Sequence, residues 1–371
     1  MTKWKKKKLG NVADLCLGKM LDEKKNRGEL LPYLANVNVR WGDFDLKNLR
    51  EMRFEEHERE RYGLREGDIV MCEGGEPGRS AIWTKSTPGM MIQKALHRIR
   101  PHQCLDERFL FYSFVHMGKI GGFSSLLTGS TIKHLPLQSL AKVEMSFPDL
   151  PVQKRIADVL SSYDAAIENN RRRIALLEEA ARLLYQEWFV RLRFPGHEHA
   201  TITNGVPEGW ERVKLGERVV LNYGKALKSE ERIDGAFPVF GSSGIVGTHE
   251  KPLTQGPGII LGRKGNVGSV FWSAKDFYAI DTVYYIDSMI SNLYLFYALK
   301  AMHFLSTDVA VPGLNRDLAY SRPLLLPAKS VLQKFLEVVS LNHEQIAKLD
   351  EMNEKLRAAR DLLLPRLMSG V

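Results

Sequence analysis

The chain has 371 residues, of which 44% are hydrophobic and 26% charged, and it carries a formal net charge of +9 and three cysteines. These proportions exclude an intrinsically disordered chain and predict two or three domains with separate cores, while the charge favours a polyanionic partner such as nucleic acid. The scattered cysteines argue against a zinc ribbon or a disulfide framework. Without a signal segment or an apolar run near the roughly 20 residues of a membrane span, we expect a cytoplasmic protein.

The first predicted domain, residues 1–149, has the mixed pattern of an α+β fold. Residues 32–39 alternate apolar and polar side chains, which predicts a half-buried strand. A continuous apolar run at 69–71 predicts a buried strand, and the glycine cluster at 74–78 predicts a tight turn directly after it.

A long helix is predicted next, in a segment of residues 150–203 that also holds a linker. Apolar residues recur from Leu160 to Trp188 at alternating steps of three and four, which is the seam pattern of a coiled coil. At about 1.5 Å per residue the helix would be roughly 55 Å long, and so long a seam needs a partner to bury it. The seam residues that we single out are Leu160, Ile167, Asn170, Ile174, Leu177 and Leu184.

The second half of the chain repeats the plan of the first. The frame W-x-x-x-K-L-G at Trp4 recurs at Trp210, and the glycine turn has a counterpart at 262–268. These anchors predict a second domain at 204–328, whose loops differ from those of the first. The second helix, residues 329–371, carries the same seam at Ile346, Leu349, Asn353, Leu356 and Leu363.

The patterns predict an α+β protein with an internal pseudo-twofold repeat. Two tandem α/β domains are separated and held by two long helices that pack as an antiparallel coiled coil. Asn170 and Asn353 at seam positions would cost stability but specify the register of the pair, the alternative being tolerance of a polar residue near a solvated end.

The glycine turn at 262–268 could approach an anion through its backbone N–H groups. No P-loop lysine or dinucleotide fingerprint follows, so a nucleotide site is not expected. Arg263, Lys264 and Asn266 on this turn are suited to a DNA backbone or to base edges, arginine to guanine and asparagine to adenine. A solvated basic turn is the alternative interpretation.

No catalytic or metal-binding pattern appears. His197 and His199 lie in a linker without the three or four convergent ligands of a metal site. Asp22-Glu23-Lys24 resembles the end of a nuclease motif, but no Pro-Asp precedes it, and the Asn/Asp-Pro-Pro-aromatic motif of amino-methyltransferases is missing. We therefore expect no catalytic residue and no metal in this chain.

The order of several anchors is specific although no single one is decisive. They are Pro32 to Val39, Gly67-Asp68-Ile69-Val70 with its glycine turn, Gly129 to Pro136, Pro148 to Ile156, Asp281 to Tyr285 and Val311 to Leu318. In this order, over nearly the whole chain, the sequence resembles the specificity (S, HsdS-type) subunits of type I restriction-modification systems. It departs from their pattern at Pro148-Asp149-Leu150, where a double proline is more usual.

The resemblance implies two target-recognition domains, each reading one half of a bipartite DNA target, with the helix pair setting the spacer between the halves. It implies that two adenine methyltransferase (M) subunits dock on the chain and that restriction (R) subunits join them. S-adenosylmethionine would then belong to the methyltransferase, and ATP and Mg to the motor-nuclease, so this chain would bind no cofactor.

Polar residues in the loops between the repeated anchors are the candidates for DNA contact. Lys133 and Arg316 are predicted to approach phosphates from matched loops, with Thr131 to His134 in the first half aligned to Gly313 to Arg316 in the second. The remaining candidates for base or backbone contact are Arg79, Lys94, Arg263, Lys264, Asn266 and Asn315.

Three other classes of protein remain possible at this stage. The first is the targeting subunit of a related enzyme whose methylase and nuclease share one polypeptide. The second is a stand-alone nuclease, which the missing carboxylate-lysine motif disfavours. The third is a coiled-coil scaffold, which the duplicated loops and basic charge disfavour.

Overall fold

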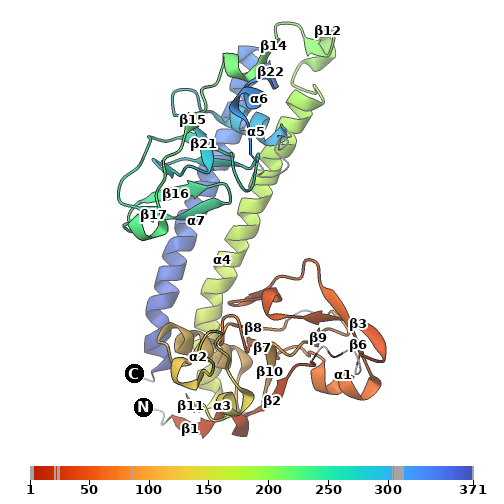
Figure 1. Ribbon diagram of the computed structural model, residues 1–371, viewed down its shortest axis with the longest axis vertical. Coiled ribbons are helices and arrows are strands. Elements are labelled where there is room, and N and C mark those ends of the chain that lie inside the picture. The colour runs from red at the N-terminus through yellow and green to blue at the C-terminus, as the bar shows by residue number, and fades with distance from the viewer. Residues whose placement is uncertain are drawn as a thin grey trace. The chain divides into compact units, whose positions relative to one another are not determined.

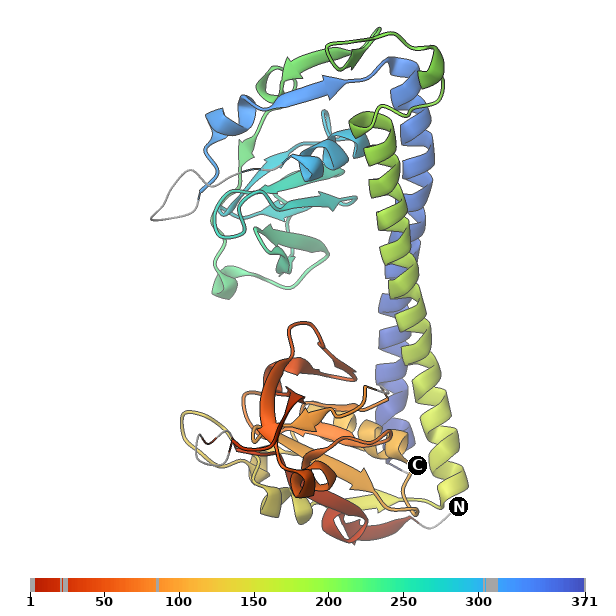
Figure 2. The ribbon, with the colours of Figure 1, turned by 90° about the vertical axis from the view of Figure 1, so that its right-hand side faces the viewer.

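The computed structural model describes residues 4–20, 22, 26–84, 87–302, 304 and 313–369. They form two compact units, Met1–Glu168 with Asn353–Val371, and Asn169–Met352. Each unit combines an α/β domain with part of two long helices, α4 and α7, which pack side by side (Figures 1 and 2).

The two long helices account for most of the helical residues described. Helix α4 spans Leu150–Tyr185 and continues through a π-helical turn at Gln186–Val190. Helix α7 spans Lys329–Met368 and keeps Pro365 inside its last turns, where the sequence predicts a kink or fraying. No helix in the described ranges is both long and apolar enough to cross a membrane.

The first unit is built on a four-stranded antiparallel sheet in the order β2-β10-β7-β8. A smaller sheet has the order β6-β3-β9, β4 pairs with β5, and β1 pairs with β11. The strands are β1 (Lys5–Lys8), β2 (Ala13–Leu17), β3 (Glu29–Leu34), β4 (Val39–Arg40), β5 (Asp43–Phe44), β6 (Arg50–Phe54), β7 (Ile69–Cys72), β8 (Ser80–Ile82), β9 (Met91–Ile92), β10 (Leu96–Pro101) and β11 (Glu144–Phe147). The helices are α1 (Glu56–Tyr62), α2 (Glu107–Lys119) and α3 (Leu137–Ala141).

Strand β7 is apolar throughout because both of its faces are buried. Ile69 and Met71 belong to a core cluster that includes Phe109 of α2. Val70 and Cys72 alternate to the opposite face and join a second cluster around Trp83. The continuous apolar run in the sequence therefore marks the centre of the domain.

The strand predicted at 32–39 is shorter than expected. Strand β3 ends at Leu34, and Asn36–Asn38 form a 3₁₀ turn instead. The Asn38 side chain accepts a hydrogen bond from the Ala35 backbone N–H at 2.9 Å and donates one to the Asp45 carbonyl at 3.0 Å. Local bonding of this kind competes with a strand ladder, which explains the early end of β3.

The second unit repeats this topology. Its four-stranded sheet has the order β15-β21-β18-β19, β14 pairs with β22, and a three-stranded sheet has the order β17-β16-β20. The strands are β12 (Ile202–Thr203), β13 (Val206–Pro207), β14 (Glu211–Lys214), β15 (Asn222–Tyr223), β16 (Phe237–Gly241), β17 (Gly244–His249), β18 (Gly258–Gly262), β19 (Val270–Ser273), β20 (Tyr278–Ala279), β21 (Val283–Ile286) and β22 (Pro323–Leu326), and the helices are α5 (Leu293–Ala301) and α6 (Arg316–Tyr320).

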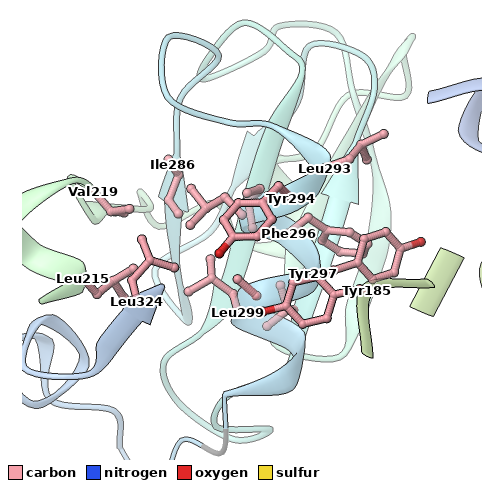
Figure 3. Close-up of a cluster of buried hydrophobic side chains, with 14 of the residues drawn as sticks. Tyr185, Leu215, Val219, Ile286, Leu293, Tyr294, Phe296, Tyr297, Leu299 and Leu324 are labelled. Atoms are coloured by element: carbon pink, nitrogen blue, oxygen red, sulfur yellow. The ribbon is translucent and has the colours of Figure 1, made fainter. Parts of the chain in front are cut away.

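The core of the second unit joins its domain to the long helices. Figure 3 shows Tyr185 of α4 beside Tyr294 and Tyr297 of α5, whose ring centroids lie 5.9 and 6.3 Å from that of Tyr185. Phe335 of α7 is fully buried in the same cluster and packs against Tyr185. This aromatic packing fixes the helices of this unit to its domain.

The two long helices run antiparallel. In the first unit, Leu160 near the start of α4 shares a core cluster with Leu364 near the end of α7. In the second unit, Tyr185 near the end of α4 shares one with Val331 near the start of α7. Of the seam residues singled out in the sequence, Leu160, Ile167, Asn170, Leu349 and Asn353 are buried, and Ile174, Leu177, Leu184, Ile346, Leu356 and Leu363 are half-buried.

Candidate nucleic-acid interface

Each unit presents a pair of loops that dock on one another. The first loop is the glycine turn after the buried strand, β7 in one unit and β18 in the other. The second precedes a short helix, and its leucine N–H donates to the first loop at 2.8 Å: Leu135 to the Glu73 carbonyl, and Leu314 to the Arg263 carbonyl. Isolated β-bridges join Gly74 to His134 and Lys264 to Gly313. We name these two assemblies the first and the second loop pair.

In each unit, a buried side chain of the four-stranded sheet forms a hydrogen bond to the second loop of the loop pair. The Nε2 of His97 on β10 lies 2.7 Å from the Leu135 carbonyl, and the Tyr284 hydroxyl on β21 donates to the Leu314 carbonyl at 3.1 Å. His97 lies opposite Met71 and Tyr284 opposite Leu261, so the two occupy equivalent positions of the repeated sheet. Burial lowers the pKa of His97, which keeps the ring neutral, and Nε2 is the donor because a carbonyl can only accept.

The first loop pair exposes two of the candidate residues. Lys133 is exposed within a loop that two backbone hydrogen bonds of 2.9 Å close between Thr128 and His134. Lys94 is exposed beside Ala95, whose carbonyl accepts the Glu73 N–H at 2.9 Å. Both lysines therefore lie on segments whose backbone is hydrogen-bonded to Glu73 at the start of the same turn.

Arg79 differs from these lysines, because its guanidinium is already hydrogen-bonded within the protein. Its guanidinium bonds Glu76 at 2.7 Å and the Asn36 carbonyl at 2.9 Å, and its side chain is only 17% exposed. Glu76 also accepts from the Trp41 indole N–H at 2.9 Å. This network stiffens the turn from which the neighbouring side chains project.

The second loop pair gathers the candidate residues of the second unit. The Arg263 guanidinium lies 5.0 Å from the Tyr223 ring centroid, and that of Arg316 lies 5.1 Å from the same centroid. Lys264 and Asn266 are exposed on the glycine turn beside Arg263. Two cations and an aromatic ring thus meet at one surface position, an arrangement suited to an anion or to a nucleic-acid backbone.

Asn315 has a structural task as the N-cap of α6. Its side chain accepts the N–H groups of Asp317 and Leu318 at 2.8 and 3.2 Å. Capping fixes the start of the helix and thereby the position of Arg316, its first residue.

The two loops align differently in space from their alignment in the sequence. Leu135 and Leu314 are counterparts because each donates its backbone N–H to the first loop. His134 and Gly313 are counterparts because each forms the isolated β-bridge to that loop. Thr131 to His134 therefore does not superpose on Gly313 to Arg316, and the counterpart of Arg316 is Leu137, the first residue of α3. Residues 305–312, which include the start of the predicted Val311 to Leu318 anchor, lie outside the described residues.

Tyr223 is the functional candidate that sequence reasoning missed. It sits on the two-residue strand β15, its side chain is 48% exposed, and its ring packs edge-on against Tyr284 at 5.1 Å. An exposed tyrosine on a strand that ends in glycine is the only local signal, and it says nothing about which cations will meet it.

One group of potential metal ligands exists among the described residues, at Glu55, His57 and Glu58. Glu58 is already paired with the buried Lys19 ammonium at 2.5 Å and accepts the Glu55 N–H at 3.0 Å. These partners satisfy the carboxylate, so the group forms a structural ion pair rather than a metal site. Glu23 and Lys24 of the nuclease-like tripeptide lie outside the described residues.

Comparison with known proteins connects this arrangement to one family. The sequence pattern of the Type I restriction modification DNA specificity domain matches residues 1–179 and 207–319. The chain is similar to the type I restriction enzyme MjaIX specificity subunit of Methanocaldococcus jannaschii, with 22% identity over 99% of this chain and 93% of the relative. It is also 30% identical to a putative type I specificity subunit of Mycoplasma pneumoniae, over 72% of this chain and 67% of the relative.

A solved structure has the same fold. The crystal structure of a type I restriction-modification system S subunit from M. genitalium matches with a TM-score of 0.59 and 20% identity, covering 99% of this chain and 96% of that one. Two α/β domains and two long packed helices are thus the shared architecture.

Proposed function

This chain belongs to the type I restriction-modification DNA specificity family, and from this premise we propose how its parts divide the work of recognition. As a specificity subunit it supplies DNA recognition and no catalysis. We propose that residues 1–149 and 204–328 are the two target-recognition domains and that each reads one half of a bipartite target. The helical segments 150–203 and 329–371 set the spacer between the half-sites and dock the methyltransferase.

The observation that carries this proposal is the duplicated loop pair. Both loop pairs follow equivalent strands and are joined by equivalent backbone hydrogen bonds. A buried side chain, His97 in one unit and Tyr284 in the other, bonds a carbonyl of the second loop. Their outward side chains differ, since the first exposes Lys94 and Lys133 while the second presents Arg263 and Arg316 around Tyr223. A constant framework with changing loop chemistry supports two domains that read different sequences.

A stripe of exposed apolar residues on α4 supports docking of a partner on the helices. Leu176 and Leu183 lie seven residues apart on α4 and are 69% and 46% exposed. Side chains at this spacing share one helix face, and an exposed apolar face marks a protein interaction surface. We name these two residues the outer stripe and assign it to the adenine methyltransferase subunits.

The proposed cofactors and partners follow from this division of tasks. S-adenosylmethionine is bound by two methyltransferase subunits, and ATP and Mg by the restriction subunits. The chain contributes the DNA contacts, and the complex acts in the cytoplasm. Sequence-independent attraction comes from lysine and arginine contacts to phosphates, consistent with the formal net charge of +9.

The decisive experiment is methylome sequencing of host DNA with the gene intact, deleted and restored on a plasmid. Deletion should abolish adenine methylation at one bipartite motif, and the plasmid copy should restore it. The motif itself then gives both half-sites and the spacer. A methylome that is unchanged on deletion, in cells that express this chain and its methyltransferase, would overturn the assignment.

A further inference from the structure

The second loop pair holds two arginines whose charges are not neutralised by the protein. Neither the Arg263 nor the Arg316 guanidinium has a carboxylate within ion-pair distance among the residues that the structure describes. Arg263 instead donates to the Asp281 carbonyl at 3.1 Å, and both guanidiniums lie over tyrosine rings. Because each is about 5 Å from one ring centroid, the two guanidinium carbons are at most about 10 Å apart.

Both arginines are held in place before any ligand arrives. The Arg263 backbone N–H donates to the Thr282 carbonyl at 2.9 Å, and its carbonyl accepts the Leu314 N–H at 2.8 Å. Arg316 follows the Asn315 cap, and its guanidinium carbon lies 5.1 Å from the ring centroid of Tyr223 and 5.9 Å from that of Tyr320. The Tyr320 hydroxyl accepts the Leu221 N–H at 3.0 Å, which anchors that ring in turn.

A guanidinium that lies over an aromatic ring keeps N–H groups available for a ligand, although Arg263 uses one of them for the Asp281 carbonyl. Two guanidinium charges within about 10 Å of one another repel, and a bound anion would relieve the repulsion. A phosphate diester oxygen pair matches the fork of N–H donors of arginine. The position is therefore suited to a singly charged oxyanion.

The equivalent position of the first unit has different chemistry. Leu17 lies opposite His97 as Tyr223 lies opposite Tyr284, so Leu17 replaces the tyrosine. Glu73 replaces Arg263, and Leu137 replaces Arg316. Glu73 bonds the His134 ring at 3.0 Å, so a carboxylate paired with an imidazole stands where the second unit has the Arg263 guanidinium.

We propose that Arg263, Arg316 and Tyr223 form a preorganised site for one phosphodiester group of the DNA backbone, and that the residues described at the equivalent position of the first unit form no counterpart of it. This inference rests on the proposed function, because the ligand is taken to be the DNA that the chain recognises. The site fixes the register of the second domain on its half-site through the backbone, and the choice of bases is left to neighbouring side chains.

The test measures the salt dependence of binding to a duplex carrying the methylome-defined target, using the full-length chain with the methyltransferase that it targets. The variants are Arg263→Gln, Arg316→Gln and the double variant. Arg218→Gln is the matched control, because it removes an exposed arginine of the same domain that is paired with Glu211 at 3.4 Å. Tyr223→Phe keeps the ring, Tyr223→Ala removes it, and melting curves show that each variant is folded.

A single shared phosphate predicts a non-additive result. Each single variant should lower the slope of log Kd against log salt by about 0.9, and the double variant should lower it by the same amount. Tyr223→Ala should act in the same direction, with Tyr223→Phe and Arg218→Gln close to wild type. The loss should be equal for target and non-target duplexes.

Other outcomes would reject the site. An unchanged slope in the double variant shows that no phosphate binds there, and a doubled change shows two independent contacts. A loss confined to the target duplex assigns Arg263 or Arg316 to a base edge instead. If the wild-type complex itself does not discriminate the target, the proposed function fails, and that result is distinct from all of these.

Discussion

Arginine side chains in the two domains differ in whether a carboxylate already neutralises them. Arg79 is bound to Glu76 of its own turn at 2.7 Å and to the Asn36 carbonyl of the 3₁₀ turn after β3. Arg263 and Arg316 rest on Tyr223 instead. An arginine with a protein partner stabilises a loop, whereas one that rests on a ring keeps its charge for a ligand.

Lys133 is the clearest candidate for a backbone contact in the first domain, because it is exposed in a loop that is closed and anchored on both sides. Lys133→Ala should weaken binding to all DNA sequences alike and reduce the salt slope by about one unit, since one counterion fewer is released. Fluorescence anisotropy titrations from 50 to about 200 mM salt would measure this. Lys133→Arg should keep the wild-type slope, and an unchanged slope in Lys133→Ala would remove this residue from the interface.

His343 of α7 should make the stability of the second unit depend on pH. Its Nε2 lies 3.0 Å from the Tyr297 hydroxyl, the rings of Trp272, Phe296 and Tyr297 surround it, and burial, helped by nearby Lys300, lowers its pKa to about 4. The unfolded chain, with a pKa of about 6.5, binds the proton first. The free energy of unfolding should therefore be highest above pH 6.5, fall by up to about 3 kcal/mol towards pH 4 and then level off.

Melting curves of the wild type and of His343→Gln between pH 7.5 and 4 would check the predicted direction of this pH dependence of stability. Glutamine retains a hydrogen-bonding group for Tyr297 but does not titrate. The difference between the two melting temperatures should change steadily below pH 6.5 in favour of the variant. Parallel pH profiles would show that His343 does not carry the effect.

At the scale of the helices, a network of charged side chains explains Arg360, which lies between Leu356 and Leu363 at a seam position of α7. Arg360 bonds Asp164 of α4, and Asp164 also accepts the Tyr112 hydroxyl at 2.6 Å. Asp361 bonds Arg360 at 2.9 Å and the Lys119 ammonium at 2.5 Å. Because every charge has a partner, the seam tolerates an arginine at a half-buried position.

Periodicity was enough to predict the two long packed helices, because apolar residues at alternating steps of three and four share one face only if the chain is helical. It could not reveal the site at Tyr223, because Tyr223, Arg263 and Arg316 come from three separate stretches and meet only through strand register. The alignment of Thr131 to His134 with Gly313 to Arg316 was wrong for a related reason. The bond from Leu314 to the Arg263 carbonyl fixes the correspondence, and the sequence carries no trace of it.

The outer stripe of α4 should be required for assembly and dispensable for folding. Leu176→Glu with Leu183→Glu places charges on an exposed face, so the melting temperature of the chain should change little. Co-purification with the methyltransferase should be lost, since burying two unpaired carboxylates in an interface is costly. Ile245→Glu is the control, an apolar residue 64% exposed on β17. Normal co-purification of the double variant would show that the methyltransferase docks elsewhere.

At the scale of the whole chain, the two units share one framework, whereas the side chains of their loops differ. His97 and Tyr284 differ in residue type yet bond equivalent carbonyls, those of Leu135 and Leu314, and the helix seam repeats with one constant offset. The loop pairs carry a carboxylate and an imidazole in one unit and two guanidiniums in the other. A framework of this kind lets each half-site change without altering the helices.

If the helix pair sets the spacer, lengthening both helices together should lengthen the spacer and leave the half-sites unchanged. Duplicating residues 171–177 in α4 and 347–353 in α7 adds one heptad to each helix, which preserves the seam pattern. Seven residues add about 10 Å of helix, equivalent to about three base pairs of DNA. Methylome sequencing should therefore find the same two half-sites separated by about three additional base pairs.

The control is the same duplication in α4 alone. Seam residues of one helix would then face the wrong partners along part of the pair, so this variant should lose stability and methylation together. Methylation by the double duplication at the original spacing would show that the helices do not set the spacer. Methylation at the lengthened spacing, with both half-sites intact, would show that recognition resides in the two domains and spacing in the helices, because only the helices were changed.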